Sequence, residues 1–440
     1  MRPRKPKAVS SEDLFRARLS NQLDLKHPLI RLAGLIEWDS FEVAFGALYH
    51  ETLGRPGKPT RLMVGLIYLK HSHNLSDEEV CERWLENPYW QFFCGFDYLQ
   101  HRLPIEPSSL SRWRERIGAS GMERLLAATA EAALASGAVK PSSLERVTVD
   151  TTVQPKAIAF PLDSRLYHRG REILVRLAAK HGVKLRQSYH RLGKRALRLA
   201  NRYAHAQQMR RARREIRRLK TFLGRVARDV GRKIAERPGV APHFTQPLAR
   251  VARLLAQQKS DHGKLYALHA PEVECLAKGK AHKRYEFGVK VSVAATNREG
   301  LVLGMMALPG NPYDGHTLAA ALAQVERMTG VAVARTYVDR GYRGHGLDSR
   351  RVFISGQRRG VTATIRRELR RRSAVEPVIG HMKTDGRLGR NFLAGVRGDA
   401  INALLCGAGY NLRLILNYLS RSLRALLFLL DGTHRLPISV

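Results

Sequence analysis

The sequence contains few cysteines and no long apolar run. Its four cysteines, at positions 81, 94, 275 and 406, have the spacing of neither a metal site nor a disulfide framework, which favours a reducing cytosol. The best candidate for a membrane span, Ala425–Leu430, is far too short to cross a membrane. The N-terminus begins Met-Arg-Pro-Arg-Lys-Pro-Lys and lacks the apolar core of a signal peptide. We therefore expect a soluble cytoplasmic protein without a membrane segment.

Acidic residues are scarce relative to basic residues. The 440 residues include 76 Lys and Arg but 38 Asp and Glu, which gives a formal net charge of +38. Such an excess repels itself within a free globule and therefore indicates a polyanionic partner. GC-rich coding would explain why Arg is preferred over Lys, but it would not explain the size of the excess. The absence of a Gly-Lys-Ser/Thr phosphate loop argues against NTP-driven work.

Residues 1–140 are expected to form an all-helical N-terminal domain. Ser76-Asp77-Glu78-Glu79 is a capping box, and Pro107-Ser108-Ser109 begins a further helix. On that second helix, Arg112 and Arg116 share a face at i,i+4, as in a helix that enters a DNA groove. A structural helix with solvated arginines explains the same pattern equally well.

Strands are expected only from about residue 145 onward. Every second residue from Tyr285 to Val293 is apolar or aromatic, which predicts a half-buried strand. We expect a turn at 297–300, an antiparallel strand at 301–308 and a helix at 316–329. A strand at 333–339, a short strand at 352–354 and a helix around Glu376 should follow. This order indicates a mixed α/β fold with a five-stranded sheet, formed by residues 141–155 and 280–415. Residues 416–440 are expected to form a C-terminal helix and tail.

Residues 156–279 are expected to form a basic helical insertion in this core. Residues 184–237 contain 19 Lys and Arg against three acids, a net charge of +16. Apolar residues at 209, 212, 216, 219, 223, 226 and 230 alternate in steps of three and four, which predicts a long amphipathic helix or a helical hairpin. An arm that grips DNA phosphates is favoured over a coiled-coil dimerisation element because the charge is so one-sided.

Three acids are candidate metal ligands. Asp150 ends the strand-like run Val147-Thr148-Val149, and Asp339 ends another such run before a Gly-rich basic loop. Ligand sites of mixed sheets tend to lie at the carboxyl ends of strands. Carboxylates amid positive charge suit a hard cation that acts on a polyanion. Taken singly, each strand acid is better explained as a turn or capping residue, Asp339 less so than Asp150.

Glu376 has a stronger structural alternative. Ser373-Ala374-Val375-Glu376 matches a capping box, in which the Glu side chain bonds back to the backbone of residue 373. However, Arg372, Glu376 and Lys383 share a helix face that differs from the apolar one. This arrangement would let the acid bind metal while the two cations hold phosphates. Asp314 and His316 are weaker candidates as outer ligands, because a turn explains them better, and His381 is expected to be a solvated or half-buried histidine.

The spacing Arg372-x3-Glu376-x6-Lys383 after a strand-borne Asp resembles the signature of bacterial insertion-sequence transposases of the DDE type. Further matches to the insertion-sequence-five group occur in the family's order, at 151–156, 310–316, 339–345 and 378–383. The resemblance covers most of the chain from residue 50 to about 415. It implies an RNase H-like catalytic core in which Asp150, Asp339 and Glu376 form the metal-binding triad.

The resemblance also implies partners and chemistry. The triad would bind two Mg²⁺ ions, with Mn²⁺ as a substitute, and would cut and join DNA at the terminal inverted repeats of an insertion sequence. Independently of the resemblance, the basic residues Arg372, Lys383, Arg343, Arg112 and Arg116 are the candidate contacts for DNA phosphates. A homodimer would hold the two ends in a synaptic complex, and DNA binding would place the protein at the bacterial nucleoid.

One position departs from the family pattern. Related transposases often carry a Tyr three residues before the motif Arg, where this chain has Leu369. That Tyr is associated with a flipped or hairpinned DNA end, so the hairpin mechanism is not expected here. Two alternatives stay open at this point: a structure-selective nuclease on the same fold, and a catalytically inactive DNA-binding relative.

Overall fold

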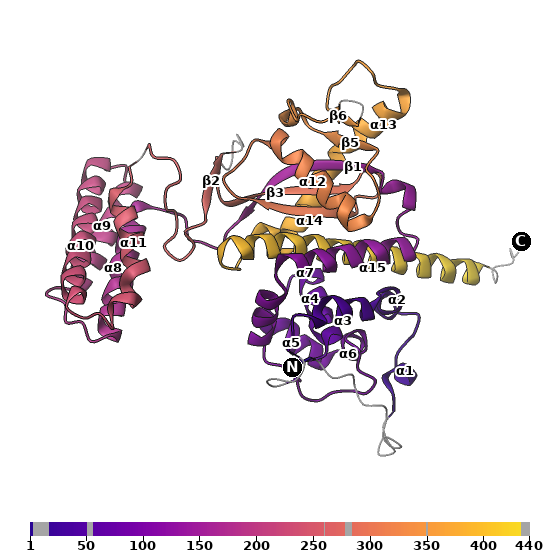
Figure 1. Cartoon of the computed structure of the whole chain (residues 1–440), viewed down its shortest axis with the longest axis horizontal. Coiled ribbons are helices and arrows are strands. Elements are labelled where there is room, and N and C mark those ends of the chain that lie inside the picture. Colours follow the sequence, from indigo (N-terminus) through magenta and orange to yellow (C-terminus); the bar gives the residue numbers. More distant parts are fainter. Residues whose placement is uncertain (3–16, 51–55, 259, 278–283, 349–350, 433–440) are drawn as a thin grey trace, which may run out of the picture. The chain divides into compact units, whose positions relative to one another are not determined.

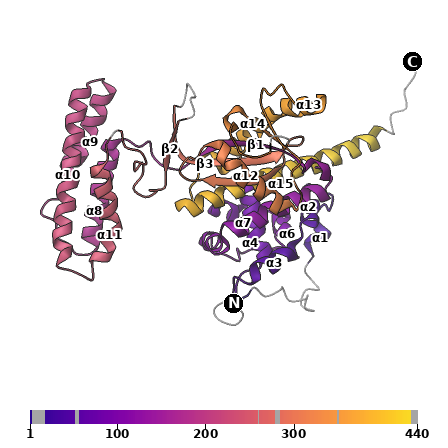
Figure 2. The same cartoon turned by 45° about the horizontal axis from the view of Figure 1, so that its top comes forward.

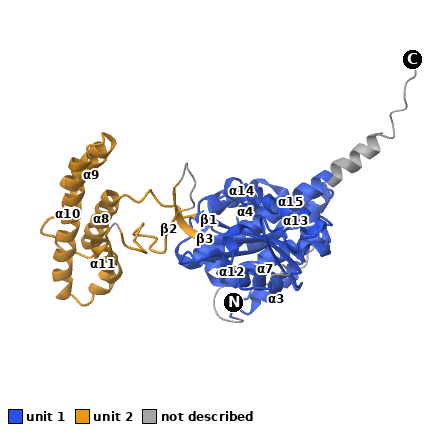
Figure 3. Ribbon diagram, turned by 90° about the horizontal axis from the view of Figure 1, so that it is seen from above, with its two compact units in different colours: residues 1–154, 290–440 blue, residues 155–289 orange. Residues whose placement is uncertain are grey.

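The computed structural model describes residues 1–2, 17–50, 56–258, 260–277, 284–348 and 351–432, with side chains described up to Arg421. These residues form two compact units (Figure 3). Unit 1 comprises residues 1–154 and 290–440, and unit 2 comprises residues 155–289. The predicted tail at 433–440 and the predicted domain boundary at 279/280 lie outside the described residues.

The described N-terminal part of unit 1 is helical. It contains α1 (Leu19–Gln22), α2 (Pro28–Leu35), α3 (Trp38–Gly46), α4 (Thr60–Ser72), α5 (Asp77–Glu86), α6 (Pro88–Phe93) and α7 (Ser108–Ala135). The predicted capping box of α5 is confirmed, because Glu79 N donates to Ser76 Oγ at 3.0 Å and Ser76 N donates to Glu79 Oε2 at 2.7 Å. The predicted α7 is also present, with a break at Gly118, whose φ is +69°. Helix α4 is almost fully buried among its neighbours.

A mixed sheet forms the centre of unit 1. Its strands are β1 (Arg146–Pro155), β3 (Tyr285–Thr296), β4 (Val302–Leu308), β5 (Arg335–Val338) and β6 (Val352–Ile354), in the spatial order β4, β3, β1, β5, β6. Strand β4 is antiparallel to β3, whereas β5 is parallel to β1 and to β6. The predicted mixed sheet is confirmed. The predicted number of five strands is wrong, since the four-residue β2 (Glu274–Ala277) pairs with the first residues of β3 within unit 2.

Helices pack against the sheet and connect its strands. Helix α12 (Asp314–Thr329) lies between β4 and β5 in sequence and ends at Gly330, whose φ is +68°. This confirms the predicted stop. After β6 come α13 (Ala363–Arg371), the short helix η4 (Arg372–Ala374) and α14 (Val375–Thr384).

The last described helix, α15 (Gly395–Gly432), runs beside α7 and packs on β4 and α4 (Figure 1). It passes without a break through position 415/416, where the sequence placed a boundary. The reason is that Leu412, Ile415 and Leu419 continue its buried stripe.

The described residues of unit 2 form four helices: α8 (Asp163–Lys180), α9 (His190–His205), α10 (Met209–Ala235) and α11 (Ala241–Ala256). Helices α9 and α10 form the predicted hairpin and lie side by side in both views (Figures 1 and 2). The apolar stripe of α10, including Leu219, Leu223, Val226 and Val230, is buried against the other helices of the same unit. The alternative interpretation, a coiled-coil dimer packed through that stripe, is therefore wrong, because the stripe is already buried in the core of unit 2.

Candidate active site

Asp150 and Asp339 belong to adjacent parallel strands. Thr148 of β1 is paired with Tyr337 of β5. Continuing this register by two residues sets Asp150 beside Asp339, and neighbouring strands are about 4.8 Å apart. Side chains two residues apart share a face of the sheet, so both carboxylates are on the face that carries Thr148 and Tyr337. The pairing of the two strands thus brings together acids that are far apart in sequence.

Asp150 lies within its strand. The prediction that it ends the strand is wrong, because β1 continues to Pro155. The β-branched residues Thr151, Thr152 and Val153 favour extended backbone and remain buried beside β3, which neighbours β1 in the sheet. Asp150 Oδ1 accepts a hydrogen bond of 2.7 Å from the backbone N–H of Thr151.

Asp339 follows directly after β5, as predicted, and caps a single helical turn. Its Oδ1 accepts a 2.8 Å hydrogen bond from Gly341 N in the short helix η3 (Arg340–Tyr342). A Cβ added to Gly341 would lie 3.0 Å from Asp339 Oδ1 and 3.5 Å from Asp314 Oδ2. Glycine here therefore leaves the two carboxylates room to approach the same stretch of backbone.

The hydroxyl of Tyr342 lies close enough to these acids for their charges to affect its pKa. Burial raises the pKa of its hydroxyl well above the ordinary value, and the carboxylates of Asp150, Asp314 and Asp339 raise this pKa further. No described residue forms a hydrogen bond with this fully buried hydroxyl. A buried polar atom of this kind usually has a partner. Three carboxylates thus lie within electrostatic range of one unsatisfied phenol.

Asp314 lies at the first turn of α12, where the sequence favoured a simple turn role. Its Oδ1 accepts hydrogen bonds from Thr151 Oγ1 at 3.1 Å and from Lys290 Nζ at 3.0 Å. Lys290 Nζ also donates to the carbonyl of Pro312 at 2.7 Å. Asp314 therefore ties α12 and β3 to the residue that follows Asp150. Sequence reasoning missed Lys290, which occupies a strand position without any distinguishing pattern.

Arg372 connects the strand acid with the helix acid. Its guanidinium lies 3.8 Å from Asp150 Oδ2 and 3.8 Å from Glu376 Oε1. The Arg372 side chain is 15% exposed, whereas that of Glu376 is 68% exposed. The capping-box alternative for Glu376 is wrong, because α14 begins without a side-chain cap and Ser373 Oγ instead donates to the carbonyl of Arg370. The Glu376 carboxylate is consequently available for another role.

The other predicted phosphate contacts lie on different elements. Lys383 is two turns after Glu376 on α14, and Arg343 is exposed just after η3. Arg112 and Arg116 are exposed on α7, as the spacing predicts, with Arg116 stacked 4.7 Å from the ring centre of Tyr49. The structure therefore brings Arg372 to the acids and gives α7 a separate basic face.

Arg114, between those two arginines, is buried and forms two hydrogen bonds with Asp77, at 2.8 and 2.6 Å. Lys70 donates to the same carboxylate at 2.6 Å. Burial by itself would raise the pKa of Asp77, but hydrogen bonds and charge from these two cations outweigh it and hold this pKa below its ordinary value. Of the three arginines at alternate positions on α7, Arg114 therefore forms a buried structural ion pair, whereas Arg112 and Arg116 are exposed.

The acids fit a hard divalent cation in the chemistry of their donors. Carboxylate oxygens are the ligands that Mg²⁺ prefers. In the parts of the chain that the structure describes, no three His, Cys, Asp or Glu side chains converge closely enough to hold a metal ion. Asp150 and Asp339 each lie two residues after the paired Thr148 and Tyr337, while Arg372 contacts both Asp150 and Glu376. If all three acids bind metal in one site, the guanidinium of Arg372 must therefore move away from them.

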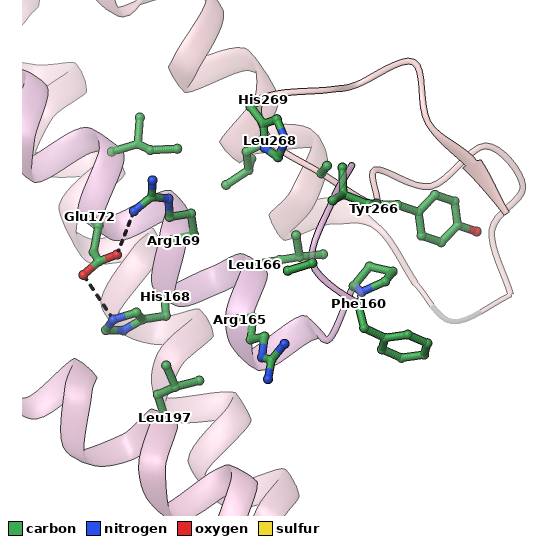
Figure 4. A pocket seen from close by; sticks show the side chains of 15 residues that line it. Phe160, Arg165, Leu166, His168, Arg169, Glu172, Leu197, Tyr266, Leu268 and His269 are labelled. Atoms are coloured by element: carbon green, nitrogen blue, oxygen red, sulfur yellow. Dashed lines mark hydrogen bonds and ion pairs between the residues drawn. The ribbon is translucent and has the colours of Figure 1, made fainter. Parts of the chain in front are cut away.

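A different pocket lies within unit 2, where the start of α8 faces the segment 266–269 (Figure 4). It encloses about 440 Å³ and is lined mainly by apolar side chains such as Phe160, Leu166 and Leu268. Glu172 at its wall pairs with His168 at 3.3 Å and with Arg169 at 3.4 Å. None of the site residues predicted from the sequence lines this pocket.

Two segments of the chain match known families. Residues 269–412 match the family described as Transposase DDE domain, and residues 17–116 match the one described as Transposase domain (DUF772). The chain belongs to the DDE transposases of insertion sequences. The DDE match of this transposase includes Asp339 and Glu376, whereas Asp150 precedes it.

A relative from Rhizobium meliloti, "Uncharacterized protein ORF8 in nfe locus", is 60% identical over 208 residues, which cover 47% of this chain and 100% of that protein. No solved structure matches the transposase. Such transposases generally use divalent metal ions and bind DNA. No helix in the described part of the chain is long and apolar enough to cross a membrane.

Proposed function

We propose that this transposase binds the terminal inverted repeats of an insertion sequence and catalyses strand cleavage and strand transfer on an RNase H-like core. The observation that carries the proposal is the parallel register that sets Asp150 beside Asp339, with Arg372 reaching both Asp150 and Glu376. The strand order β4, β3, β1, β5, β6, with three parallel strands on one side, supports the assigned core.

Asp150, Asp339 and Glu376 would hold two Mg²⁺ ions. When bound, the metal would activate water or a 3′-OH and offset charge on the scissile phosphate. Arg372, once released from the carboxylates, would donate to the oxygens of that phosphate, and Lys383 would supply a second cation from the same helix face. The three acids would thus bind the metal ions, Arg372 would hold the phosphate, and Lys383 would offset its negative charge.

The exposed arginines of α9 and α10 would bind DNA phosphates outside the reacting strand. Their apolar stripe is consumed by the core of unit 2, so their basic faces are left to solvent. Neutralising phosphates with such a face gives affinity without sequence preference. The exposed Arg112 and Arg116 of α7 would add contacts from the N-terminal helices. Working on two DNA ends favours a homodimer in the synaptic complex.

The decisive experiment uses DNA that carries the sequences flanking the coding region, with Mg²⁺. Asp150→Asn, Asp339→Asn and Glu376→Gln should each lower strand cleavage and strand transfer at least about 10³-fold while DNA binding persists. Glu37→Gln, at an exposed acid just before α3, is the matched control and should cut like the native protein. Cleavage without joining by the native chain would indicate a nuclease. Undiminished cleavage by all three variants would overturn the assignment of the acids.

A further inference from the structure

A pocket lined by four arginines lies in unit 1, at the end of β1 away from Asp150. It encloses about 290 Å³ and is lined by Arg146, Arg298, Thr364, Arg367, Glu368 and Arg371. The residues come from the start of β1, the β3–β4 turn and α13. Four cations thus share one hollow with a single acid.

That acid is already occupied by other groups. Glu368 is buried, and its carboxylate accepts a hydrogen bond from the hydroxyl of Tyr337 and pairs with Arg335 Nε at 3.2 Å. Arg146 Nε lies farther away, at 3.7 Å. Because the single carboxylate of Glu368 is shared with Tyr337, Arg335 and Arg146, it cannot balance the charge of all four arginines of the pocket.

The exposed arginines of the pocket carry uncompensated charge. Within the described part of the chain, Arg367 and Arg371 have no ion pair, and Arg298 has a long contact of 3.9 Å with Glu299. Like charges at i,i+4 on a helix, such as those of Arg367 and Arg371, are unfavourable by themselves. An anion in the pocket would relieve this repulsion.

A buried network holds the walls of the pocket in place. Asn297, before Arg298, donates from its side chain to Thr148 Oγ1 at 2.9 Å and to the carbonyl of Glu368 at 3.1 Å. Its backbone N–H donates to the carbonyl of Arg146 at 2.9 Å. The turn, β1 and α13 are therefore joined by hydrogen bonds at the pocket, so its arginines are positioned before a ligand arrives.

We propose that this four-arginine pocket binds a phosphate group of the DNA strand that is being cut, several nucleotides from the scissile phosphate. The inference rests on the proposed function. Guanidinium forks match phosphate oxygens two at a time, and Thr364 would add a hydroxyl donor. Arg371 of the pocket immediately precedes Arg372, which contacts Asp150.

The distance between the two sites suits one strand of DNA. Arg146 and Asp150 are four residues apart on β1, a span of about 13 Å at a rise of roughly 3.3 Å per residue. B-DNA rises about 3.4 Å per nucleotide of each strand along its axis, and the phosphates also wind around that axis, so the span corresponds to at most roughly four nucleotides. A phosphate fixed there would set the register in which the strand crosses the acids.

Helix α13 itself supplies a matched control. Arg367→Ala/Arg371→Ala removes two arginines that line the pocket, whereas Arg366→Ala/Arg370→Ala removes two exposed arginines of the same helix at the same spacing that do not line it. Binding of the flanking-sequence duplex is measured in EDTA at several NaCl concentrations. The pocket pair should weaken binding about ten-fold and lower the salt slope by about 0.9, the value expected when one phosphate fewer is neutralised, with smaller changes for the control pair. Equal changes for both pairs would overturn the pocket.

Single neutral methylphosphonate linkages, scanned along each strand of the duplex, locate the phosphate. At one position, the neutral linkage should weaken DNA binding by the native chain and by Arg366→Ala/Arg370→Ala. The same linkage should cause no further weakening of DNA binding by Arg367→Ala/Arg371→Ala. The absence of any such coupled position would refute the assignment to the DNA strand. Titration with inorganic phosphate tests whether the ligand is instead a free phosphate. Micromolar phosphate binding that is lost only in Arg367→Ala/Arg371→Ala, together with the absence of a coupled linkage, would assign the pocket to a free phosphate.

These outcomes are separate from those of the catalytic proposal. If the native chain fails to cut DNA but a coupled linkage is found, the pocket stands and the catalytic proposal fails. If the native chain cuts DNA but the two variant pairs behave alike, the pocket fails and the catalytic proposal stands.

Discussion

The guanidinium of Arg372 lies 3.8 Å from the carboxylate of Asp150. The two residues are separated by more than 200 positions in the chain, and the contact joins the central strand β1 to η4, just before α14. Arg372 also lies 3.8 Å from Glu376, so one cation stands between two of the acids proposed to bind metal. A metal ion and this guanidinium would therefore compete for the same carboxylates.

Replacing Arg372 tests that competition. Arg372→Ala should lower single-turnover strand cleavage about 100-fold, because the phosphate is deprived of a charged donor. Binding of Mn²⁺, measured calorimetrically without DNA, should be as tight as in the native chain or tighter, because the competing cation is gone. Weaker Mn²⁺ binding in this variant would show instead that Arg372 is needed to arrange the acids.

Removing the Asp314 carboxylate tests its supporting role. Asp314→Asn takes the charge partner from Lys290 and weakens the bond from Thr151 beside Asp150. Cleavage should fall about 10- to 100-fold, as is usual for partners of metal ligands, with a rise in the Mg²⁺ concentration needed for half-maximal rate. His316→Asn, at an exposed position on the same helix, is the control and should leave both quantities unchanged. An unaltered Mg²⁺ requirement in Asp314→Asn would rule out this role.

The buried ion pair of Asp77 is predicted to matter for stability. Asp77→Asn leaves Arg114 and Lys70 without their shared carboxylate, which should cost about 3–5 kcal/mol in the free energy of unfolding. Burial lowers the pKa of Lys70 to about 8, and removal of the acid should lower it further. Urea unfolding measures the cost, and Glu78→Gln on the same helix turn is the control. A decrease below about 1 kcal/mol would mean that water replaces the carboxylate.

The same pair predicts a direction for pH dependence. The pKa of Asp77 is lower in the folded chain than its ordinary value, so the folded state binds this proton less readily than the unfolded state. Its contribution is fully present above the ordinary carboxyl range near about pH 4. It disappears as the pH falls through the lower folded pKa. The contribution of Asp77 ionisation to the stability difference between the native chain and Asp77→Asn should therefore stay constant from neutral pH to about 5 and shrink in strong acid.

The basic face of α10 is predicted to set the salt dependence of DNA binding. Arg213, Arg214 and Arg217 are exposed there. Replacing all three with Ala should flatten the slope of log affinity against log salt by about 0.9 for each phosphate that is no longer neutralised. The matching triple replacement with Lys keeps the charge and should keep the slope. An unchanged slope in the Ala variant would exclude this face from DNA binding.

Several parts of the fold follow from local sequence. The alternation from Tyr285 onward predicts the strand β3, but the expected half-burial is wrong, because β1 and β4 flank β3 and both of its faces are buried from Gly288 onward. Gly330 ends α12, where its positive φ allows it. The capping box at Ser76 is fixed by residues three apart and forms as predicted. These features are local, so neighbouring residues carry enough information to place them.

Other features depend on partners that are distant in sequence. The four-residue β2 has too little pattern to be recognised, and Asp150 remains within a strand because β1 continues beside β3. The possible cap at Glu376 matches a local rule, yet Ser373 bonds to the preceding turn instead. Arg114 resembles its exposed neighbours in sequence, although packing of α5 on α7 turns it toward Asp77. Spacing alone does not distinguish such outcomes.

The sequence by itself determined the basic character of the chain, the periodicity of its main helices and strands, and the motif that relates Arg372, Glu376 and Lys383. Tertiary structure decided which of these groups meet. Parallel pairing of β1 with β5 aligned Asp150 with Asp339, and packing of unit 2 consumed the apolar stripe of α10. Folding also gathered four arginines into one hollow. The physical reason is that periodicity and charge are properties of neighbouring residues, whereas strand register and burial depend on segments hundreds of residues apart.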